Sequence, residues 1–267
     1  MTDPQHPSPT RTLDDDWREY LMGTHPEIVK GRRMFSWLPS DPRCRSCHSP
    51  FHGIGSLFMR NFGYTPWEKN PSLCKRCVVR FSKRGIGGAE IELTMLFADV
   101  RGSTEMAEGT TGTAFTALIN RFYEVGSKVL MSHDALIDKF VGDEVIGLFI
   151  PLLTGEMHAS RALEAAQDLL RQTGHGDPAG PWIPLGIGVH TGIARVGVVG
   201  TPGAVMDFTA LGDSVNTTAR LASSAATGEI LVSDASVRAA GFDVGGREHR
   251  DLRLKGKAEP VGVTVVR

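Results

Sequence analysis

The segment Phe208 to Arg220, FTALGDSVNTTAR, constrains the chain more than any other part of its sequence. Asp213 has the short acceptor side chain of a helix N-cap. A helix that begins there brings Asn216 and Arg220, four residues apart, onto one face. A side-chain amide and a guanidinium then project side by side. The segment alone leaves open whether this face binds a polar ligand or only forms a surface hydrogen bond.

Two further segments each place a carboxylate at the end of an apolar run. Residues 91–100, IELTMLFADV, indicate a buried strand with Asp99 at its exposed end. The runs ALIDKF and EVIGLF, residues 135–140 and 144–149, indicate a hairpin whose turn contains Asp143. Single aspartates in such places are commonly caps or turn residues. Two together can converge on hard cations, which prefer oxygen ligands.

FADVRGST (97–104), KFVGDEVIGLF (139–149) and the segment that ends at Arg220 occur in an order and spacing that resemble the class III nucleotidyl cyclases. Those enzymes convert a nucleoside triphosphate to a cyclic nucleotide and pyrophosphate. The resemblance covers about residues 88–267. It implies an α/β (α+β) fold with the family's ferredoxin-like βαββαβ core.

The rest of this region alternates strands and helices, which also indicates an α/β domain. Apolar residues recur every three to four positions and predict helices over about 103–131 and 157–170. The stretch PLGIGVHTGIARVGVVG is rich in β-branched residues and glycines, and it predicts two strands with a tight turn near Thr191 and Gly192. EILVS predicts a further strand, and residues 251–266 predict a final strand pair.

Cyclisation requires attack of the ribose 3′-oxygen on the α-phosphorus while pyrophosphate leaves. The 3′-hydroxyl must lose its proton readily, and the charge of the triphosphate must be neutralised. Two Mg²⁺ or Mn²⁺ ions with carboxylate ligands meet both needs. The resemblance implies that Asp99 and Asp143 bind these ions, with the carbonyl of Val100 as a further ligand.

The resemblance also assigns the groups that contact the rest of the nucleotide. Arg220 would stabilise the α-phosphoryl transition state through its forked donors, and Asn216 would orient the ribose. Lys255, in LKGK, matches the lysine that meets the terminal phosphates, with Lys257 as the alternative. A Lys-Gly-Lys loop is otherwise an ordinary solvated turn.

Two positions bear on the choice of base. Lys139 is a pure donor, which complements N1 of adenine and opposes the N1–H of guanine. Thr209 stands where many adenylyl cyclases of the family have Asp. Its hydroxyl can accept from the adenine amino group but can also donate to guanine O6. Lysine with threonine resembles the soluble branch that responds to bicarbonate. We therefore expect ATP as the substrate.

The net charge of −1 conceals three unlike segments. Residues 1–29 are acidic, with six acids against two arginines. Residues 30–84 have twelve Lys and Arg against two acids, a formal +10, and residues 85–267 have a formal −7. The shift falls near Arg84, in the glycine-rich stretch SKRGIGGAEIE. It predicts a linker between a basic module, residues 30–84, and a cyclase domain, residues 85–267.

All four cysteines lie in the basic module, in two C-x-x-C pairs: Cys44 with Cys47, and Cys74 with Cys77. This spacing predicts one tetrahedral four-cysteine site for structural zinc, with a structured loop between the pairs. An iron–sulfur cluster and thiol redox chemistry are the alternatives. The first pair and His48 also form a C-x-x-C-H haem attachment pattern. That attachment occurs after export, which conflicts with the need for a cytoplasmic triphosphate.

The basic module also contains seven aromatic residues: Phe35, Trp37, Phe51, Phe58, Phe62, Tyr64 and Trp67. Basic and aromatic residues together can bind nucleic acid, but in a small zinc-nucleated module the aromatic residues usually form the core. The opposite charges of the two regions favour contact between the module and the cyclase domain over nucleic-acid binding. We expect His48, His52 and His190 to be structural.

The longest strongly apolar stretch, residues 145–153, is far shorter than the ~20 residues of a membrane-spanning helix. The N-terminus lacks the apolar core of a signal peptide. We therefore expect a cytoplasmic protein with no membrane span. Since one chain has both the metal aspartates and the nucleotide-binding group, a head-to-tail homodimer can assemble two complete sites. A catalytically silent nucleotide-binding regulator and a nucleic-acid-binding zinc protein are the alternatives.

Overall fold

The computed structural model describes residues 12–68, 70–201 and 206–267, so part of the acidic N-terminal segment lies outside the described residues. Eight strands form the main sheet, in the order β4-β5-β3-β6-β8-β10-β9, with β7 paired to β6. The strands are β3 (Gly87–Val100), β4 (Leu136–Val141), β5 (Glu144–Phe149), β6 (Leu185–Gly200), β7 (Met206–Leu211), β8 (Glu229–Ser233), β9 (His249–Leu252) and β10 (Val261–Val266).

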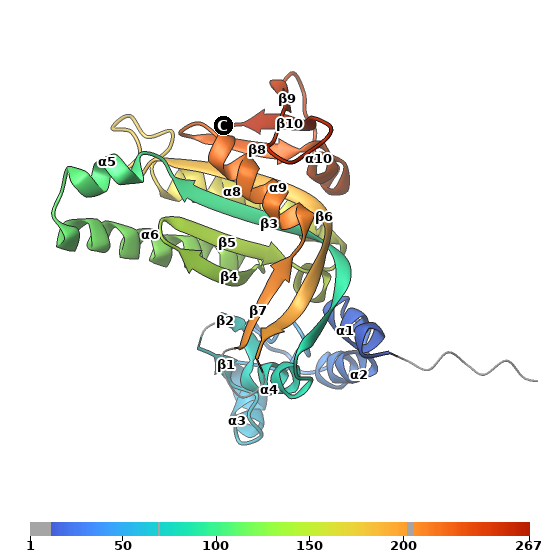
Figure 1. Cartoon of the computed structure of the whole chain (residues 1–267). Coiled ribbons are helices and arrows are strands. Elements are labelled where there is room, and N and C mark those ends of the chain that lie inside the picture. The colour runs from blue at the N-terminus through green and yellow to red at the C-terminus, as the bar shows by residue number, and fades with distance from the viewer. Residues whose placement is uncertain (1–11, 69, 202–205) are drawn as a thin grey trace, which may run out of the picture.

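In the described part of the chain, helices on both faces of the sheet follow β3 (Figure 1). They are α5 (Ser103–Glu108), α6 (Gly112–Ser132), α7 (Pro151–Thr154), the 3-10 helix η1 (Gly155–Met157), α8 (His158–Gln172), α9 (Asp213–Ser224) and α10 (Asp234–Ala240). The succession β3-α6-β4-β5-α8-β6 is a βαββαβ unit, and its strands lie in the ferredoxin-like order β4-β5-β3-β6. This confirms the predicted fold class.

The side chains of β3 point alternately to the two faces of the sheet. The strand therefore contributes residues to a hydrophobic layer on each face. Leu96 and Ala98 face a core built with α6 and α8. Met95 and Phe97 face the opposite side, where α9 and the N-terminal helices pack. The sheet is therefore covered on both faces, and α9 occupies the face opposite α6 and α8 (Figure 1).

The predicted turn near Thr191 and Gly192 is wrong, because β6 continues unbroken through both residues. The glycines of this strand serve close packing instead. A Cβ on Gly188 would lie 2.4 Å from the backbone nitrogen of Ala222 in α9, and one on Gly192 would lie 2.5 Å from the hydroxyl of Ser214. Glycine thus lets α9 approach the strand without a side chain between them.

Two predicted helix boundaries also differ from the structure. The helix expected over 103–131 is two helices, because α5 ends before Gly109 and α6 begins at Gly112 with the Thr111 hydroxyl accepting from Ala114 N. Asp213 is not the N-cap of α9 but its first residue, and Gly212 occupies the cap position with a φ of 135°. A side chain at that cap would be strained, so glycine replaces the usual acceptor.

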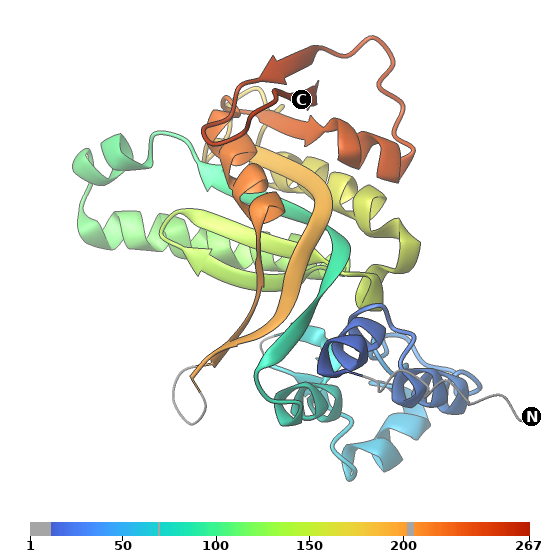
Figure 2. The ribbon, with the colours of Figure 1, turned by 45° about the vertical axis from the view of Figure 1, so that its right-hand side comes forward.

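The N-terminal region contains α1 (Leu13–Leu21), α2 (Pro26–Phe35), α3 (Gly53–Arg60), a two-stranded sheet of β1 (Pro66–Trp67) and β2 (Asn70–Cys74), and α4 (Lys75–Lys83). It packs beneath the first part of β3 and the ends of β6 and β7 (Figures 1 and 2). Most of the stretch expected as a linker is regular structure, since only residues 84–86 separate α4 from β3.

Aromatic side chains join the N-terminal region to the sheet. Trp17 is fully buried, and its ring centroid lies 6.5 Å from that of Phe208 in β7. Phe81 of α4 packs edge-on against Phe208 and lies 6.2 Å from Trp17. The N-terminal region and the sheet therefore share one hydrophobic core. The domain boundary near Arg84 stays a prediction. None of the helices in the described residues is both long and apolar enough to cross a membrane.

Candidate active site and cysteine cluster

The two predicted metal aspartates lie at the same end of neighbouring strands. Asp99 pairs with Glu144 across β3 and β5, and Asp143 stands in the adjoining hairpin turn, where its carbonyl accepts from Val100 N at 3.2 Å. Burial raises the pKa of Asp99, against the opposing effect of its ion pair with Arg101. The structure thus places Asp99, Val100 and Asp143 together, and their role as metal ligands stays a prediction.

Glu144 is a third carboxylate at this end of the sheet, and our reading of the sequence did not single it out. Burial, together with the charges of Asp99 and Asp143, raises the pKa of Glu144 to about 7. Its position directly after Asp143 was the available signal. Three carboxylates in a half-buried place repel one another, and a hard divalent cation relieves that repulsion through oxygen ligands. The residues present therefore fit the expected cations.

The predicted base-recognition pair lies where β4 faces β7. Lys139 Nζ is 3.2 Å from the carboxylate of Asp207 and 3.8 Å from that of Asp138. The Thr209 hydroxyl donates to Asp138 Oδ2 at 3.0 Å. The pairing of β4 with β5 shifts between Ile137 and Lys139, a bulge that allows two consecutive side chains to reach the same neighbouring strand.

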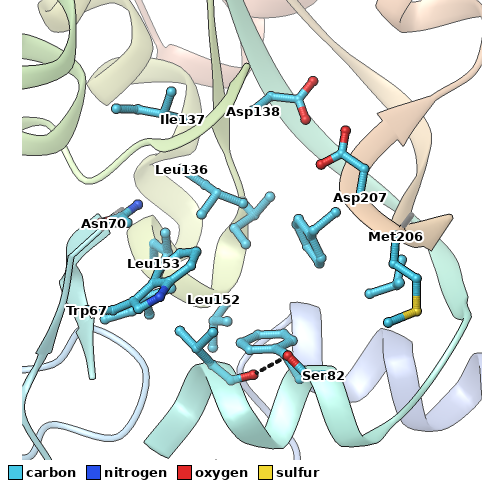
Figure 3. A pocket seen from close by; sticks show the side chains of 16 residues that line it. Trp67, Asn70, Ser82, Leu136, Ile137, Asp138, Leu152, Leu153, Met206 and Asp207 are labelled. Atoms are coloured by element: carbon cyan, nitrogen blue, oxygen red, sulfur yellow. Dashed lines mark hydrogen bonds between the residues drawn. The ribbon is translucent and has the colours of Figure 1, made fainter. Parts of the chain in front are cut away.

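Asp138 is the second residue that our sequence interpretation missed. Only 6% of its side chain is exposed, and its Oδ1 has no hydrogen-bond partner in the described part of the chain. Burial raises the pKa of Asp138 to about 6. It lines a cavity of about 400 Å³ between β4, β7 and the N-terminal region. Figure 3 shows Asp138 and Asp207 at one end of this cavity, away from Trp67 and Ser82.

The amide and guanidinium group lies on α9, as predicted. Asn216 is exposed, and Arg220 is partly buried beside the loop between β9 and β10. A Cβ on Gly256 would lie 3.4 Å from Arg220 Nη2, so the guanidinium rests against this loop. Lys257 forms an ion pair with Asp213, whereas Lys255 is exposed to solvent.

Within one chain the metal aspartates and the start of α9 are well separated. Asp99 pairs with Gly186 of β6, whereas the Ser214 hydroxyl donates to the carbonyl of Ile193, seven residues further along that strand. At about 3.3 Å per residue this is roughly 20 Å. The start of α9 thus lies away from the metal aspartates, whereas the end of the helix returns toward them, since Arg101 Nη1 donates to the carbonyl of Ser223.

The four cysteines converge as the spacing predicted. Their sulfur atoms all lie within 4.8 Å of one another and are buried. Cys44 Sγ is 3.9 Å from Cys77 Sγ, and Cys47 Sγ is 3.8 Å from Cys74 Sγ, too far for disulfides. Four sulfurs placed tetrahedrally at about 2.3 Å from Zn²⁺ are about 3.8 Å apart. The geometry therefore fits a tetrahedral zinc site with four cysteine ligands.

The loops around this cluster contact the cyclase region. Arg32 donates to the carbonyl of Ser46, next to Cys47, and also to the carbonyl of Leu152 in α7, at 2.9 and 2.8 Å. Arg45 pairs with the buried carboxylate of Asp134 at 2.7 Å. Asp134 lies in the turn that leads from α6 into β4. The cysteine loop is thus tied to the strand that carries Lys139.

The aromatic residues of the basic module divide into two groups. Phe35, Phe51 and Tyr64 are buried and Trp67 is half-buried, as expected of a small core, but Trp37, Phe58 and Phe62 are more than half exposed. Of the three histidines singled out in the sequence, His190 has a clear hydrogen-bond partner. His190 Nδ1 lies 2.9 Å from the Ser233 hydroxyl, and burial lowers its pKa to about 4. That partner is what a structural histidine requires.

Comparison with known proteins agrees with the fold and the order of these motifs. Residues 89–266 match the family model of the adenylate and guanylate cyclase catalytic domain. The chain is 31% identical over 140 residues to adenylate cyclase 1 of Rhizobium meliloti and 32% identical over 133 residues to the adenylate cyclase of Anabaena cylindrica. These matches cover 49% and 48% of this chain but only 20% and 26% of those longer proteins.

Solved structures give the same result. The guanylyl cyclase Cya2 is 28% identical with a TM-score of 0.62, and the match covers 68% of this chain and 94% of that one. The adenylyl cyclase CyaB from P. aeruginosa is 30% identical with a TM-score of 0.58, covering 68% and 97%. The chain belongs to the adenylate and guanylate cyclase catalytic domain family. Its relatives include both adenylate and guanylate cyclases.

Proposed function

We propose that this protein is an adenylate cyclase, which converts ATP to 3′,5′-cyclic AMP and pyrophosphate. The observation that carries the choice of base is the position of Lys139 beside Thr209, where β4 faces β7. An ammonium group complements N1 of adenine and opposes the N1–H of guanine. The two adenylate cyclases named above are consistent with this choice, although guanylate cyclases are also among the relatives.

Asp99, Asp143 and the carbonyl of Val100 would hold two Mg²⁺ or Mn²⁺ ions. When bound, these cations would lower the pKa of the ribose 3′-hydroxyl and neutralise charge on the triphosphate. Asn216 would fix the ribose so that its 3′-oxygen lies in line with the α-phosphorus. Arg220 would donate to the α-phosphoryl oxygens as their charge increases.

Lys255 would contact the terminal phosphates, because its side chain is exposed in the loop against which Arg220 rests. Lys257 is the weaker candidate, since its ammonium group is already paired with Asp213. The roughly 20 Å between Asp99 and the start of α9 favours a site shared between two chains. We therefore infer a head-to-tail homodimer with two equivalent sites.

The cysteine cluster is proposed to hold one structural Zn²⁺ per chain. The convergence of the four buried sulfur atoms, two pairs of which lie 3.8 and 3.9 Å apart, supports this assignment. Metal analysis of protein purified under reducing conditions should find about one zinc per chain. Iron with sulfide, or no metal, would contradict the proposal. Nucleic-acid binding is not proposed, because Arg32, Arg45 and Arg84 make contacts within the protein.

The activity is tested by incubating purified protein with ATP or GTP, each with Mg²⁺ or Mn²⁺, and measuring both cyclic nucleotides. We expect cyclic AMP formation that requires the cation and that Asp99→Asn or Asp143→Asn abolishes. Asp251→Asn is the matched control, since Asp251 is exposed on β9 and lies outside the proposed site. Binding of ATP without any product would instead favour a silent nucleotide-binding regulator.

A further inference from the structure

The Thr209 hydroxyl has a single proton, and the groups around it decide where that proton points. Thr209 is 4% exposed, and its oxygen lies 3.0 Å from Asp138 Oδ2. An ionised carboxylate can only accept a hydrogen bond, so the hydroxyl must donate. The other acceptor near it in the described residues, the carbonyl of Ala210, is more distant at 3.5 Å. The Thr209 hydroxyl therefore donates its proton in a hydrogen bond to Asp138.

We propose that Asp138 is a positioning residue that sets the base specificity of the enzyme, by holding Thr209 in the orientation of a pure acceptor. A hydroxyl whose proton is engaged offers only lone pairs to the base. It can then accept from the amino group of adenine but cannot donate to O6 of guanine. With Lys139 as the donor to N1, the pair matches adenine at both positions. This inference rests on the proposed adenylate cyclase function.

The surroundings of Asp138 stabilise its hydrogen bond with Thr209. On its own strand the neighbouring charge is Lys139, and on β7 the facing groups are Thr209 and the partly exposed Asp207. The N-terminal region contributes Trp67 and the Asn70 amide to the cavity that Asp138 lines. The remaining wall is mostly apolar, so the bond between Thr209 and Asp138 lies in a place of low dielectric, where hydrogen bonds strengthen.

The same geometry implies a dependence on pH. Burial raises the pKa of Asp138 to about 6, so the carboxylate is ionised at pH 8 and largely protonated at pH 5. A protonated Asp138 can donate to Thr209, which frees the threonine proton to turn toward the base. The preference for ATP over GTP should therefore fall as the pH falls through about 6. The ratio of the two substrates isolates this effect, because both use the same metal and phosphate contacts.

The decisive variant is Asp138→Asn, whose amide has the same shape but can donate to Thr209. We expect the ATP-to-GTP ratio of kcat/KM to fall about tenfold or more, because a buried polar group that loses its partner weakens binding by roughly that factor. The loss should lie mainly in KM for ATP. The ratio in this variant should also no longer change between pH 5 and 8, a result that a merely structural role of Asp138 would not produce.

Three further variants extend the test, and the first of them does not depend on the folding of Asp138→Asn. Thr209→Val removes the hydroxyl and should lower the ratio to a similar level, and combining it with Asp138→Asn should add little. Asp138→Asn with Thr209→Asp supplies an acceptor directly and should restore the preference for ATP. The midpoint of thermal unfolding, measured for each variant, separates altered specificity from loss of structure.

The outcomes distinguish this inference from the proposed function. Wild-type protein that forms no cyclic nucleotide would contradict the proposed function, and calorimetric binding of non-cyclisable ATP and GTP analogues would then test the specificity alone. An unchanged ratio in folded Asp138→Asn, with the pH dependence of the wild type retained, would overturn the inference. Failure of Thr209→Asp to restore the ratio would overturn it as well.

Discussion

Removing the Trp17 side chain should destabilise the whole chain and not only the N-terminal region. The indole is fully buried, packs near Phe81 and Phe208, and lies so close to β3 that a Cβ on Gly87 would be 2.7 Å from its Nε1. Nε1 has no hydrogen-bond partner in the described residues, so Trp17→Ala mainly loses packing. Tryptophan-to-alanine changes in a core cost about 3–5 kcal/mol.

For a chain of this size, each kcal/mol lost from the free energy of unfolding lowers the unfolding midpoint by roughly 2–3 °C. The midpoint of Trp17→Ala should therefore fall by roughly 6–15 °C. Circular dichroism at rising temperature measures it, and the matched control is Trp37→Ala, since Trp37 is 75% exposed. The control should shift the free energy of unfolding by about 0.5 kcal/mol or less. Two separate transitions in Trp17→Ala, with the larger one at the wild-type temperature, would refute the shared core.

Three other results are expected. Mixing inactive Asp99→Ala and Arg220→Ala homodimers should restore roughly a quarter of wild-type activity, if random exchange makes half the dimers mixed and one site in each is intact; a dead mixture with exchange verified by labelled subunits would exclude shared sites. Arginine hydrogen bonds lower the pKa of Glu229 to about 2, so Glu229→Gln should lose about 2–3 kcal/mol of stability at pH 7. That difference should vanish in urea titrations as the pH falls from 4.5 to 2, because the depressed pKa stabilises only the ionised form. Gly188→Ala should lower the unfolding midpoint and the activity by displacing α9, whereas Gly112→Ala, with nothing within 4 Å, should not.

The parts of the fold that the sequence predicted are those set by local pattern. Alternating apolar residues and a glycine-aspartate turn identify the β4–β5 hairpin, and the spacing of Asn216 and Arg220 identifies one face of α9. The continuity of β6 could not be predicted, because Gly188 and Gly192 are also typical of turns. Their role depends on how closely α9 approaches, which is a tertiary distance.

The missed site residues have a similar explanation. Simple alternation along a strand places Asp138 and Lys139 on opposite faces. The bulge after Ile137 removes that alternation, so both side chains reach β7. Nothing in the local sequence indicates the bulge. Glu144 was overlooked because its raised pKa arises from burial and from Asp99, which lies on another strand. The cysteine spacing predicted the cluster but not its contacts with the turn before β4.

The position of the N-terminal region indicates which part of the cyclase it can influence. Its contacts reach the two strands of the proposed base-recognition pair: Arg45 pairs with Asp134 just before β4, and Trp17 packs on Phe208, the neighbour of Thr209. The metal aspartates lie at the far end of β3, up to about 40 Å of strand from Gly87, where the region begins to pack. Asp138 of β4 and Thr209 of β7 are joined by a hydrogen bond, so the contacts of the N-terminal region converge on the strands of the proposed base-recognition pair.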